Sequence, residues 1–428
     1  ALERCRRDGA WSGSSIDGII KKYALDRREA ALAARLCLGV LQNSLLCDYY
    51  IGCYCSTEPK RLEPKLHDIL MLGVYQILFL DRIPARAAVN ESVALCRKCG
   101  MSRASGLANA VLRRIAENKS AGTLPDIPSE GSAEYLSIKY SHPEWLASRI
   151  ISERGYDFAE AFLACNNRPA PLTIQVNTLK ISAEDYRRAL LRAGIDFEYD
   201  ERLRGCFVLS GGNVAELPGF AEGLFYVQDR AARTAAEIAA PEQGMTVLDA
   251  CSAPGGKSFA AAIAMEGEGQ ILSCDIHPHK LKLIDSGAKR LGISCLRTML
   301  ADAREHNAAW DRAADVVIAD VPCSGLGIIR KKPDIRYKDL APTERLPAVL
   351  AAILENVSRY VRPGGALLYS TCTVLRRENE DVANAFLARH PAFHLEAFTV
   401  PDGLDGQNGG MLTLYPHVHE ADGFFICK

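Results

Sequence analysis

One stretch, Met245 to Lys257, constrains the fold of this chain more than any other. Its apolar residues end on Asp249, two adjacent glycines follow, and an alanine-rich run begins at Ser258. This order predicts a buried strand, a tight turn and the start of a helix. Because Gly255 and Gly256 lack a Cβ atom, a ligand can approach the backbone there, beside the N–H groups that open the helix. We therefore expect a nucleotide-type pocket at the carboxyl end of a strand in an α/β sheet.

The chain on both sides of this stretch repeats the pattern of a strand followed by a helix, from about residue 223 to residue 428. Strands joined by helical crossovers pair in parallel, so we expect a Rossmann-like, doubly wound α/β domain that a C-terminal hairpin closes. The carboxyl ends of parallel strands meet at one edge of the sheet, where such folds bind ligands. Six residues follow predicted strands and are expected at this edge: Gly255, Asp275, Asp302, Asp320, Cys323 and Cys372.

The acidic residues at the strand ends indicate a ligand that contains a ribose. Asp275 follows Gly256 by 19 residues and ends the next strand, where a carboxylate can accept hydrogen bonds from both ribose hydroxyls. Asp302, after the third strand, would reach the adenine amine. This arrangement suits NAD or S-adenosylmethionine, but the chain lacks the Gly-x-Gly-x-x-Gly fingerprint that holds a pyrophosphate. We therefore favour S-adenosylmethionine as the cofactor.

The first part of the chain has a different pattern, with apolar residues at helical spacing. Residues 1–120 are expected to be helical throughout, and a linker rich in Pro and Gly follows at 121–132. A helical connector is expected at 133–170, and a period-two alternation then begins a small α+β module at 171–222. One positive face could be formed by Arg97, Lys98, Arg103, Arg113 and Arg114. An ordinary solvated helix surface explains these residues equally well.

Composition limits the class of protein. The chain of 428 residues is 48% hydrophobic and has a net charge of −1, so any contact with nucleic acid must come from local basic patches. Its 15 cysteines are scattered and no export signal is visible, which favours reduced thiols in the cytoplasm. No apolar run reaches the roughly 18 residues that a membrane helix needs. The closely spaced pairs Cys53/Cys55 and Cys96/Cys99 do not fit a zinc site, so we expect no metal.

Three groups of motifs resemble one known family over essentially the whole chain. Ala88-Val-Asn-Glu-Ser-Val and Ala108-Asn-Ala-Val-Leu-Arg-Arg are similar to the NusB-type RNA-binding domain at the front of RsmB/Sun-type ribosomal RNA methyltransferases. Asp320-Val-Pro-Cys-Ser-Gly-Leu-Gly and Ser370-Thr-Cys-Thr match the paired cysteine motifs of RNA 5-methylcytosine methyltransferases. The stretch with the two glycines also matches this family, with Ser252 where alanine is more frequent.

The resemblance implies an all-α NusB-like N-terminal domain, a small ferredoxin- or RRM-like α+β module and a class I methyltransferase domain over 223–428. It implies that Cys372 is the nucleophile and that Cys323 assists release of the product. Asp320 would bind the N3–N4 edge of cytosine, and Lys257 would orient cofactor and base or lower a thiol pKa. The residues implied to hold S-adenosylmethionine are Cys251, Ser252, Ala253, Pro254, Gly255, Gly256, Lys257, Asp275, Asp302 and Asp320.

The expected function is an S-adenosylmethionine-dependent RNA methyltransferase that makes 5-methylcytosine in 16S ribosomal RNA. Cysteine suits this reaction because a thiolate that adds at C6 of the base makes C5 nucleophilic. Two alternatives stay open: a tRNA methyltransferase with the same chemistry, and a noncatalytic RNA-binding assembly factor. The expected partner is ribosomal RNA, and no oligomer is required. Two basic segments, 330–336 and 376–377, are expected to hold phosphates beside the target base, with an ordinary exposed loop as the alternative for either.

Overall fold

The computed structural model describes residues 1–8, 10–338, 341–400 and 409–428. Its internal contacts divide the chain into two compact units. The helical unit comprises Ala1–Pro169 together with Ile329–Lys338, and the catalytic unit comprises Ala170–Ile328 together with Asp339–Lys428. The short segment 329–338 thus belongs to the helical unit, although the residues on either side of it in the sequence belong to the other unit.

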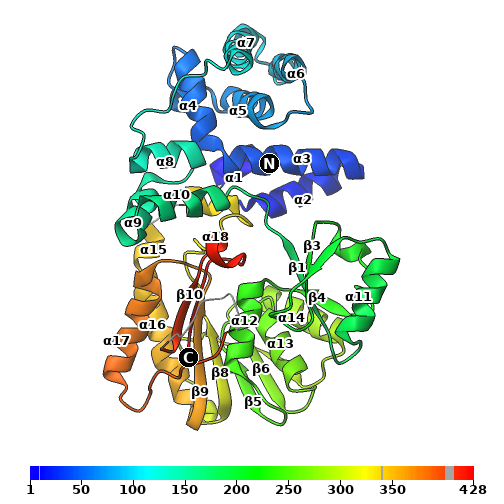
Figure 1. Cartoon of the computed structure of the whole chain (residues 1–428), viewed down its shortest axis with the longest axis vertical. Coiled ribbons are helices and arrows are strands. Elements are labelled where there is room, and N and C mark those ends of the chain that lie inside the picture. The colour runs from blue at the N-terminus through cyan, green and yellow to red at the C-terminus, as the bar shows by residue number, and fades with distance from the viewer. Residues whose placement is uncertain (9, 339–340, 401–408) are drawn as a thin grey trace. The chain divides into compact units, whose positions relative to one another are not determined.

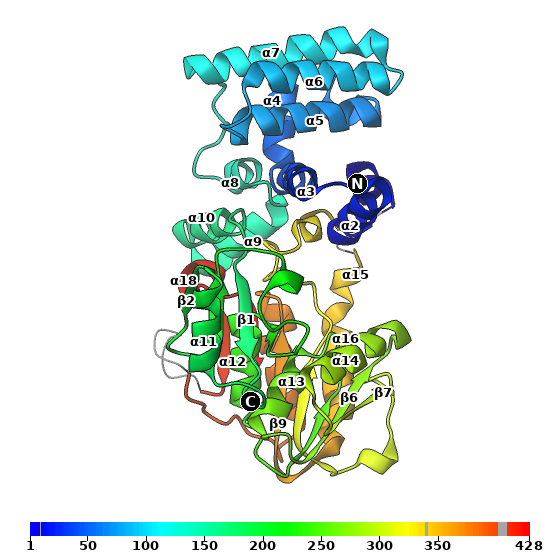
Figure 2. The ribbon, with the colours of Figure 1, turned by 90° about the vertical axis from the view of Figure 1, so that its right-hand side faces the viewer.

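The helical unit is all-α, as its spacing of apolar residues predicts. Helix α5 forms its centre, because Leu70 and Val74 are fully buried in one cluster with residues of the surrounding helices. Figure 2 shows α5, α6 and α7 lying side by side. The absence of a Cβ atom at Gly73 allows Leu112 of α7 to pack closely on α5. The helices are α1 (Leu2–Asp8), α2 (Ser12–Tyr23), α3 (Arg27–Gln42), α4 (Ser44–Tyr54), α5 (Pro64–Phe79), α6 (Ala85–Lys98), α7 (Ser105–Ala121), α8 (Ala133–Tyr140), α9 (Glu144–Arg154) and α10 (Tyr156–Cys165).

None of the described helices is by itself long and apolar enough to cross a bilayer. Helices α3 and α4 reach that length and apolar character only when they are taken together, across a bend of 76°.

A small α+β module opens the catalytic unit, and its observed fold confirms the ferredoxin-like expectation. Its antiparallel sheet has the order β2-β3-β1-β4. Helix α11 covers the sheet, where the ring of Tyr186 lies 5.9 Å from that of Phe207 and 5.6 Å from that of Phe225. The elements are β1 (Leu172–Val176), α11 (Ala183–Arg192), β2 (Phe197–Tyr199), β3 (Cys206–Leu209) and β4 (Phe225–Val227).

The rest of the catalytic unit is a seven-stranded sheet of order β10-β11-β9-β8-β5-β6-β7. Five of its strands pair in parallel, and the antiparallel hairpin of β10 and β11 closes one side, so the Rossmann-like prediction is confirmed. The strands are β5 (Thr246–Asp249), β6 (Gln270–Asp275), β7 (Leu296–Leu300), β8 (Ala314–Asp320), β9 (Val361–Thr371), β10 (Met411–Leu414) and β11 (Phe424–Cys427).

Helices cover both faces of this sheet, as Figure 1 shows. Helices α12 (Arg230–Ala239), α13 (Gly256–Ala264) and α14 (Pro278–Leu291) bury one face in a single apolar cluster. Helices α16 (Leu346–Val357) and α17 (Glu380–Arg389) bury the other face in a second cluster. The carboxyl ends of the parallel strands meet at one edge of the sheet, and this is where the site must be sought.

One predicted element differs from the structure. The sequence predicts a single helix from Pro342 to Tyr360, but that prediction was wrong. The segment forms α15 (Ala341–Glu344), α16 and a final 3₁₀ turn at Ser358–Tyr360. Pro347 lies in the first turn of α16, where a missing N–H is tolerated, and it cannot continue a helix from the preceding turn.

Gly223 lies where the small module is joined to the sheet domain, and a substitution there tests how closely the two are packed. Its φ is +71°, and a Cβ atom there would overlap the backbone oxygen of Arg290. We expect Gly223→Ala to lower the free energy of unfolding by about 3 kcal/mol, the sum of backbone strain and a steric clash. Gly194, in the same small module, is a matched control, because its φ of +65° is close to that of Gly223 but a Cβ atom would meet nothing within 4 Å. Urea denaturation should show a smaller loss for Gly194→Ala; equal losses would contradict the clash.

Candidate active site

The glycine turn between β5 and α13 has the geometry that the sequence predicts. Ser252 ties it to the next strand, because its backbone N–H and its hydroxyl donate to Cys274 O at 2.8 and 3.0 Å. Gly255 has a φ of +108°, and a Cβ atom there would clash with the ring of Phe259. Only glycine can therefore hold this turn against the helix that follows.

A cavity of about 220 Å³ opens beside the turn. Seven of the predicted site residues line it: Ser252, Ala253, Pro254, Gly256, Lys257, Asp320 and Cys372. Its other lining residues are Val227, Gln228, Asp229, Ala232, Asp249, Ile328, Asp422 and Phe424. Five predicted site residues lie outside this lining: Cys251, Gly255, Asp275, Asp302 and Cys323. The sheet thus brings the glycine turn and the Thr-Cys motif to one cavity.

A lysine–aspartate ion pair forms part of the cavity wall. Lys257 Nζ lies 2.7 Å from Asp320 Oδ2, although the lysine is only 6% exposed. The hydroxyl of Ser370 donates to Asp320 Oδ1 at 2.9 Å, and the ring centroid of Phe424 lies 4.8 Å from Lys257 Nζ. The carboxylate is therefore held from both sides, by a cation and by a hydroxyl, which fixes its orientation toward the cavity.

The two motif cysteines meet at the ends of β8 and β9. Their Sγ atoms are 3.3 Å apart. The loops that carry them are cross-bonded, since Ser324 N donates to Glu378 Oε2 at 2.8 Å and Ser324 Oγ lies 2.8 Å from Thr373 Oγ1. The hydrogen bond with Cys372, together with burial, raises the pKa of the Cys323 thiol well above its usual value. Cys323 therefore keeps its proton and can donate it toward the sulfur of Cys372.

The two remaining strand-end acids lie along the same edge: Asp275 is the last residue of β6, and Asp302 follows β7. Asp275 is buried, accepts from His277 N at 2.9 Å and has Lys280 Nζ at 3.8 Å. Asp302 accepts from Arg304 Nε at 2.9 Å, and this pairing lowers the pKa of its carboxyl. An adenine amine would have to share the Asp302 carboxylate with that guanidinium.

Eight residues of the cavity lining were not among the predicted site residues, and Asp249, Gln228 and Phe424 are three of them. Asp249 is fully buried and accepts from Ser258 Oγ at 2.6 Å, and burial raises the pKa of its carboxyl to about 7. The side-chain amide of Gln228 is buried without a hydrogen-bond partner among the described residues. Asp249 could have been found from its place at a strand end. Gln228 and Phe424 do not stand at the carboxyl end of a parallel strand, so their place in the sequence does not indicate a site. Gln228 comes before β5, and Phe424 belongs to the last strand.

The basic segment after the Pro-Cys motif differs from its expected role. Arg336 is 3% exposed, and its guanidinium donates to backbone carbonyls of the helical unit. The expectation that Arg336 holds a phosphate is therefore wrong. In the second segment, Arg376 pairs with Asp381 at 3.1 Å, and Arg377 donates to Thr343 Oγ1 at 3.3 Å.

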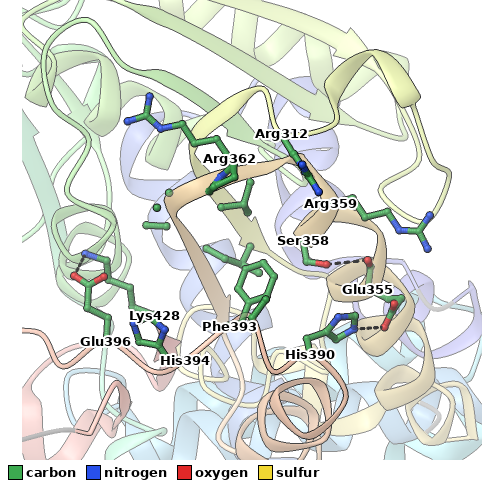
Figure 3. A pocket seen from close by; sticks show the side chains of 17 residues that line it. Arg312, Glu355, Ser358, Arg359, Arg362, His390, Phe393, His394, Glu396 and Lys428 are labelled. Atoms are coloured by element: carbon green, nitrogen blue, oxygen red, sulfur yellow. Dashed lines mark hydrogen bonds and ion pairs between the residues drawn. The ribbon is translucent and has the colours of Figure 1, made fainter.

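A second, larger cavity of about 570 Å³ lies where β9 begins, at the opposite edge of the sheet from the cysteines (Figure 3). Basic residues line it, but His390 pairs with Glu355 at 2.8 Å and Lys428 with Glu396 at 2.9 Å. The side chains of Arg359 and Arg362 point away from each other in Figure 3. These cations do not converge on one point, and none of the predicted site residues lines this cavity. Across the described ranges, no group of His, Cys, Asp and Glu could hold a metal ion.

Fold and site together define a class: a Rossmann-like methyltransferase with a glycine turn, strand-end acids and two cysteines at one edge. Comparison with known families agrees. Residues 2–117 match the NusB family, residues 142–215 match the RsmF/B-like ferredoxin-like domain, and residues 236–428 match 16S rRNA methyltransferase RsmB/F. These three matches follow the order of the parts seen in the structure.

Relatives match over nearly the whole chain. The probable ribosomal RNA small subunit methyltransferase B of Bacillus subtilis (strain 168) is 33% identical over 100% of this chain and 96% of its own length. The ribosomal RNA small subunit methyltransferase B of Klebsiella pneumoniae is 31% identical over 97% of this chain and 94% of its own length. The chain belongs to the RsmB/F family of 16S rRNA methyltransferases.

Two solved structures have a similar fold. The crystal structure of PH0851 has a TM-score of 0.79 at 27% identity and covers 95% of this chain and 92% of that one. NSun6 from Pyrococcus horikoshii with SFG has a TM-score of 0.62 at 21% identity, covering 67% of this chain and 97% of that one, and shows likeness of fold alone. The comparisons confirm the expected activity, that of an S-adenosylmethionine-dependent RNA methyltransferase. They also confirm the choice of S-adenosylmethionine over NAD as the cofactor.

The buried carboxyl of Asp249 predicts a pH-dependent stability. Its pKa of about 7 in the folded chain lies above the value of about 3.9 in an unfolded one. The folded state therefore holds an extra proton between these values, and its stability falls as the pH rises through 7. We expect Asp249→Asn, which stays neutral, to be more stable than the wild type at pH 8 by about 1–3 kcal/mol, and to lose this advantage at pH 4.

Thermal unfolding of both proteins between pH 4 and pH 8 measures this difference. Asp196→Asn, at an exposed position of the small module, is the matched control and should follow the wild type at every pH. An Asp249→Asn curve parallel to that of the wild type would contradict a protonated carboxyl in the core.

Proposed function

We propose that this chain makes 5-methylcytosine in small-subunit ribosomal RNA, in the cytoplasm, through a covalent adduct between Cys372 and C6 of the base. The observation that carries the proposal is the 3.3 Å separation of the Cys323 and Cys372 sulfur atoms, with Cys372 on the wall of the cavity that the glycine turn opens. The names of the Bacillus and Klebsiella relatives support the choice of small-subunit ribosomal RNA.

The residues present fit the cofactor. The positive φ of Gly255 exposes the backbone at the start of α13, and Asp275 offers a buried carboxylate at the next strand end. We assign the turn from Cys251 to Lys257, with Asp275, Asp302 and Asp320, to its binding. When bound, S-adenosylmethionine supplies the methyl group.

The side chains of this chain prepare the base. C5 of cytosine is a poor nucleophile until the Cys372 thiolate forms a bond to C6, which moves the electron pair of the C5–C6 bond to C5. Asp320, oriented by Lys257 and Ser370, hydrogen-bonds the N3–N4 edge and stabilises the protonated ring of the adduct. The same contact rejects uracil, whose edge presents a donor at N3 and an acceptor at O4.

Release requires transfer of the C5 proton to a base, a role that water in the open cavity can fill. The electrons of that C–H bond then restore the C5–C6 double bond and expel the sulfur of Cys372. Cys323 assists this elimination by donating its own proton to the departing sulfur, which lies 3.3 Å from it. Both faces of the ring must be reached, so the target base is single-stranded or flipped out of its stack.

A tRNA methyltransferase would use the same side chains, and the NusB-type helical unit together with the names of the relatives is what favours ribosomal RNA. A noncatalytic assembly factor would have no need for two sulfur atoms in contact, one of them at the wall of a cavity.

The first test asks whether small-subunit ribosomal RNA is methylated by this chain and whether Cys372 is required. In cells that lack this protein, bisulfite sequencing should reveal a small-subunit cytosine that has lost its methyl group. The wild-type chain should restore it and Cys372→Ala should not, because the variant cannot form the C6 bond. Calorimetry with purified Cys372→Ala should show S-adenosylmethionine affinity within about twofold of the wild type. Cys295→Ala, another partly buried thiol of the same unit, is the control. Restored methylation by Cys372→Ala would reject the assigned nucleophile.

A second test isolates the release step. Cys323→Ala should accumulate a protein–RNA adduct that survives denaturing electrophoresis, because the Cys372–C6 bond forms but is not expelled. The double variant Cys323→Ala/Cys372→Ala should give no shifted band. A clean gel for the single variant would count against a role of Cys323 in release.

A further inference from the structure

A fully buried acid, Glu378, lies beside the two loops that carry the cysteines, and all of these residues belong to the catalytic unit. It ends the 3₁₀ helix Arg376–Glu378, which follows the Thr-Cys motif. Burial raises the pKa of its carboxyl, and its Oε1 atom has no hydrogen-bond partner among the described residues. Burying such a group costs stability, and groups of this kind gather at functional sites. The contacts of the carboxylate therefore indicate what it does for the site.

The carboxylate holds the backbone next to Cys323. Ser324 N, which is bonded covalently to the carbonyl carbon of Cys323, donates to Glu378 Oε2 at 2.8 Å. A hydrogen bond to an ionised oxygen is stronger than one between neutral groups. The hydroxyl of Ser324 lies 2.8 Å from Thr373 Oγ1, but a hydroxyl group can rotate and restrains the backbone less. The carboxylate thus fixes the peptide unit that leaves Cys323.

Two further backbone bonds hold the Pro-Cys loop, but farther from the sulfur. Val321 N, two residues before Cys323, donates to β9 at 3.0 Å, and Gly327 N, four residues after it, donates to Cys372 O at 3.0 Å. Of the three bonds, the one to Glu378 is nearest to Cys323 in the chain. Without it, the residues between Val321 and Gly327 can shift while both outer bonds remain.

The Thr-Cys loop is held by a different side chain, that of Asn379. Thr371 Oγ1 donates to Asn379 Oδ1 at 2.6 Å, and Asn379 Nδ2 donates to Thr373 O at 3.1 Å, so one amide binds the residues on both sides of Cys372. Thr371 also ends β9, where it pairs with β11. Cys372 therefore keeps its place without the carboxylate of Glu378.

We propose that Glu378 is a positioning residue for release of the product: by accepting from Ser324 N, its carboxylate keeps the sulfur of Cys323 within reach of the sulfur of Cys372. The two Sγ atoms are 3.3 Å apart, a distance over which a proton can pass from one to the other. A small displacement of the Pro-Cys loop would break this contact while leaving the nucleophile in place. The proposal rests on the release role put forward above for Cys323.

The test uses the full-length chain with substitutions at Glu378. Glu378→Ala removes the acceptor of Ser324 N, whereas Glu378→Gln keeps an oxygen that can accept from it and loses only the charge. Glu380→Ala is the matched control, because Glu380 also accepts one side-chain hydrogen bond, from Thr413 Oγ1 at 3.1 Å on β10, away from both cysteine loops.

The first measurement reports the placement of the two sulfur atoms and needs no RNA. Phenylarsine oxide bonds both thiols of a close pair through its arsenic atom, and its oxygen leaves as water. Peptide mapping by mass spectrometry then follows the bridge between Cys323 and Cys372. Bridging is expected to be about tenfold slower in Glu378→Ala, and within about twofold of the wild-type rate in Glu378→Gln and Glu380→Ala.

The second measurement is the ratio of covalent RNA adduct to released methylated product in a single turnover. It counts only molecules that have reacted, so a loss of folded protein does not change it. Glu378→Ala should raise this ratio about tenfold, because the adduct forms but its sulfur receives no proton. S-adenosylmethionine affinity should stay within about twofold of the wild type, because Glu378 does not line the cavity.

An unchanged rate of bridging in Glu378→Ala would overturn the proposal. Slower bridging with an unchanged ratio would also overturn it, provided that Cys323→Ala accumulates the adduct in the same assay. If Cys323→Ala gives no adduct, the release role has failed, and bridging alone decides whether Glu378 places the sulfur. If Glu378→Ala does not fold, Glu378→Asp replaces it: its carboxylate is one methylene short of Ser324 N, so slower bridging is again expected and an unchanged rate contradicts the proposal.

Discussion

The parallel pairing of β8 with β9 is the constraint on which the site depends. Its register places Asp320 opposite Ser370, and Val321 N continues the pairing by donating to Ser370 O. Two loops that are far apart in the chain therefore leave the sheet side by side, and their cysteine sulfur atoms come into contact. A slip of one residue in this register would turn Asp320 and Ser370 to opposite faces, and the Asp320 carboxylate would lose its hydroxyl partner.

An ion pair and a buried carboxyl group set the charge at the wall of the cavity. Lys257 is the cation of the cavity wall, and its partner is Asp320. Asp249, buried beneath the turn, carries less negative charge near neutral pH because burial raises the pKa of its carboxyl to about 7. Asp229 and Asp422 also line the cavity, and Asp320 is the acid that Lys257 and Ser370 orient. Asp249 and Asp320 therefore have different roles, because the first is buried and the second is paired with a cation at the cavity wall.

The helical unit uses the same physics for a structural purpose. Arg336 is a buried cation, and carbonyls at helix ends receive its hydrogen bonds. Burial lowers the pKa of its guanidinium only to about 10, so the charge persists at neutral pH. The carbonyls at the converging helix ends supply the negative potential around Arg336. Around Lys257, an aspartate side chain supplies it.

The sequence by itself determined the order of the three parts, the glycine turn, the strand-end acids and the two cysteines, because each is a local pattern of strand, turn and residue type. It could not determine which residues from distant segments complete the cavity, so Gln228 and Phe424 went unpredicted, and a proline broke a helix expected to be continuous. Arg336 shows the limit most clearly. A basic residue in a loop has the same appearance in sequence whether it meets phosphate or protein. Only the tertiary structure, by gathering carbonyls from α3, α8 and α10, decided that it is buried.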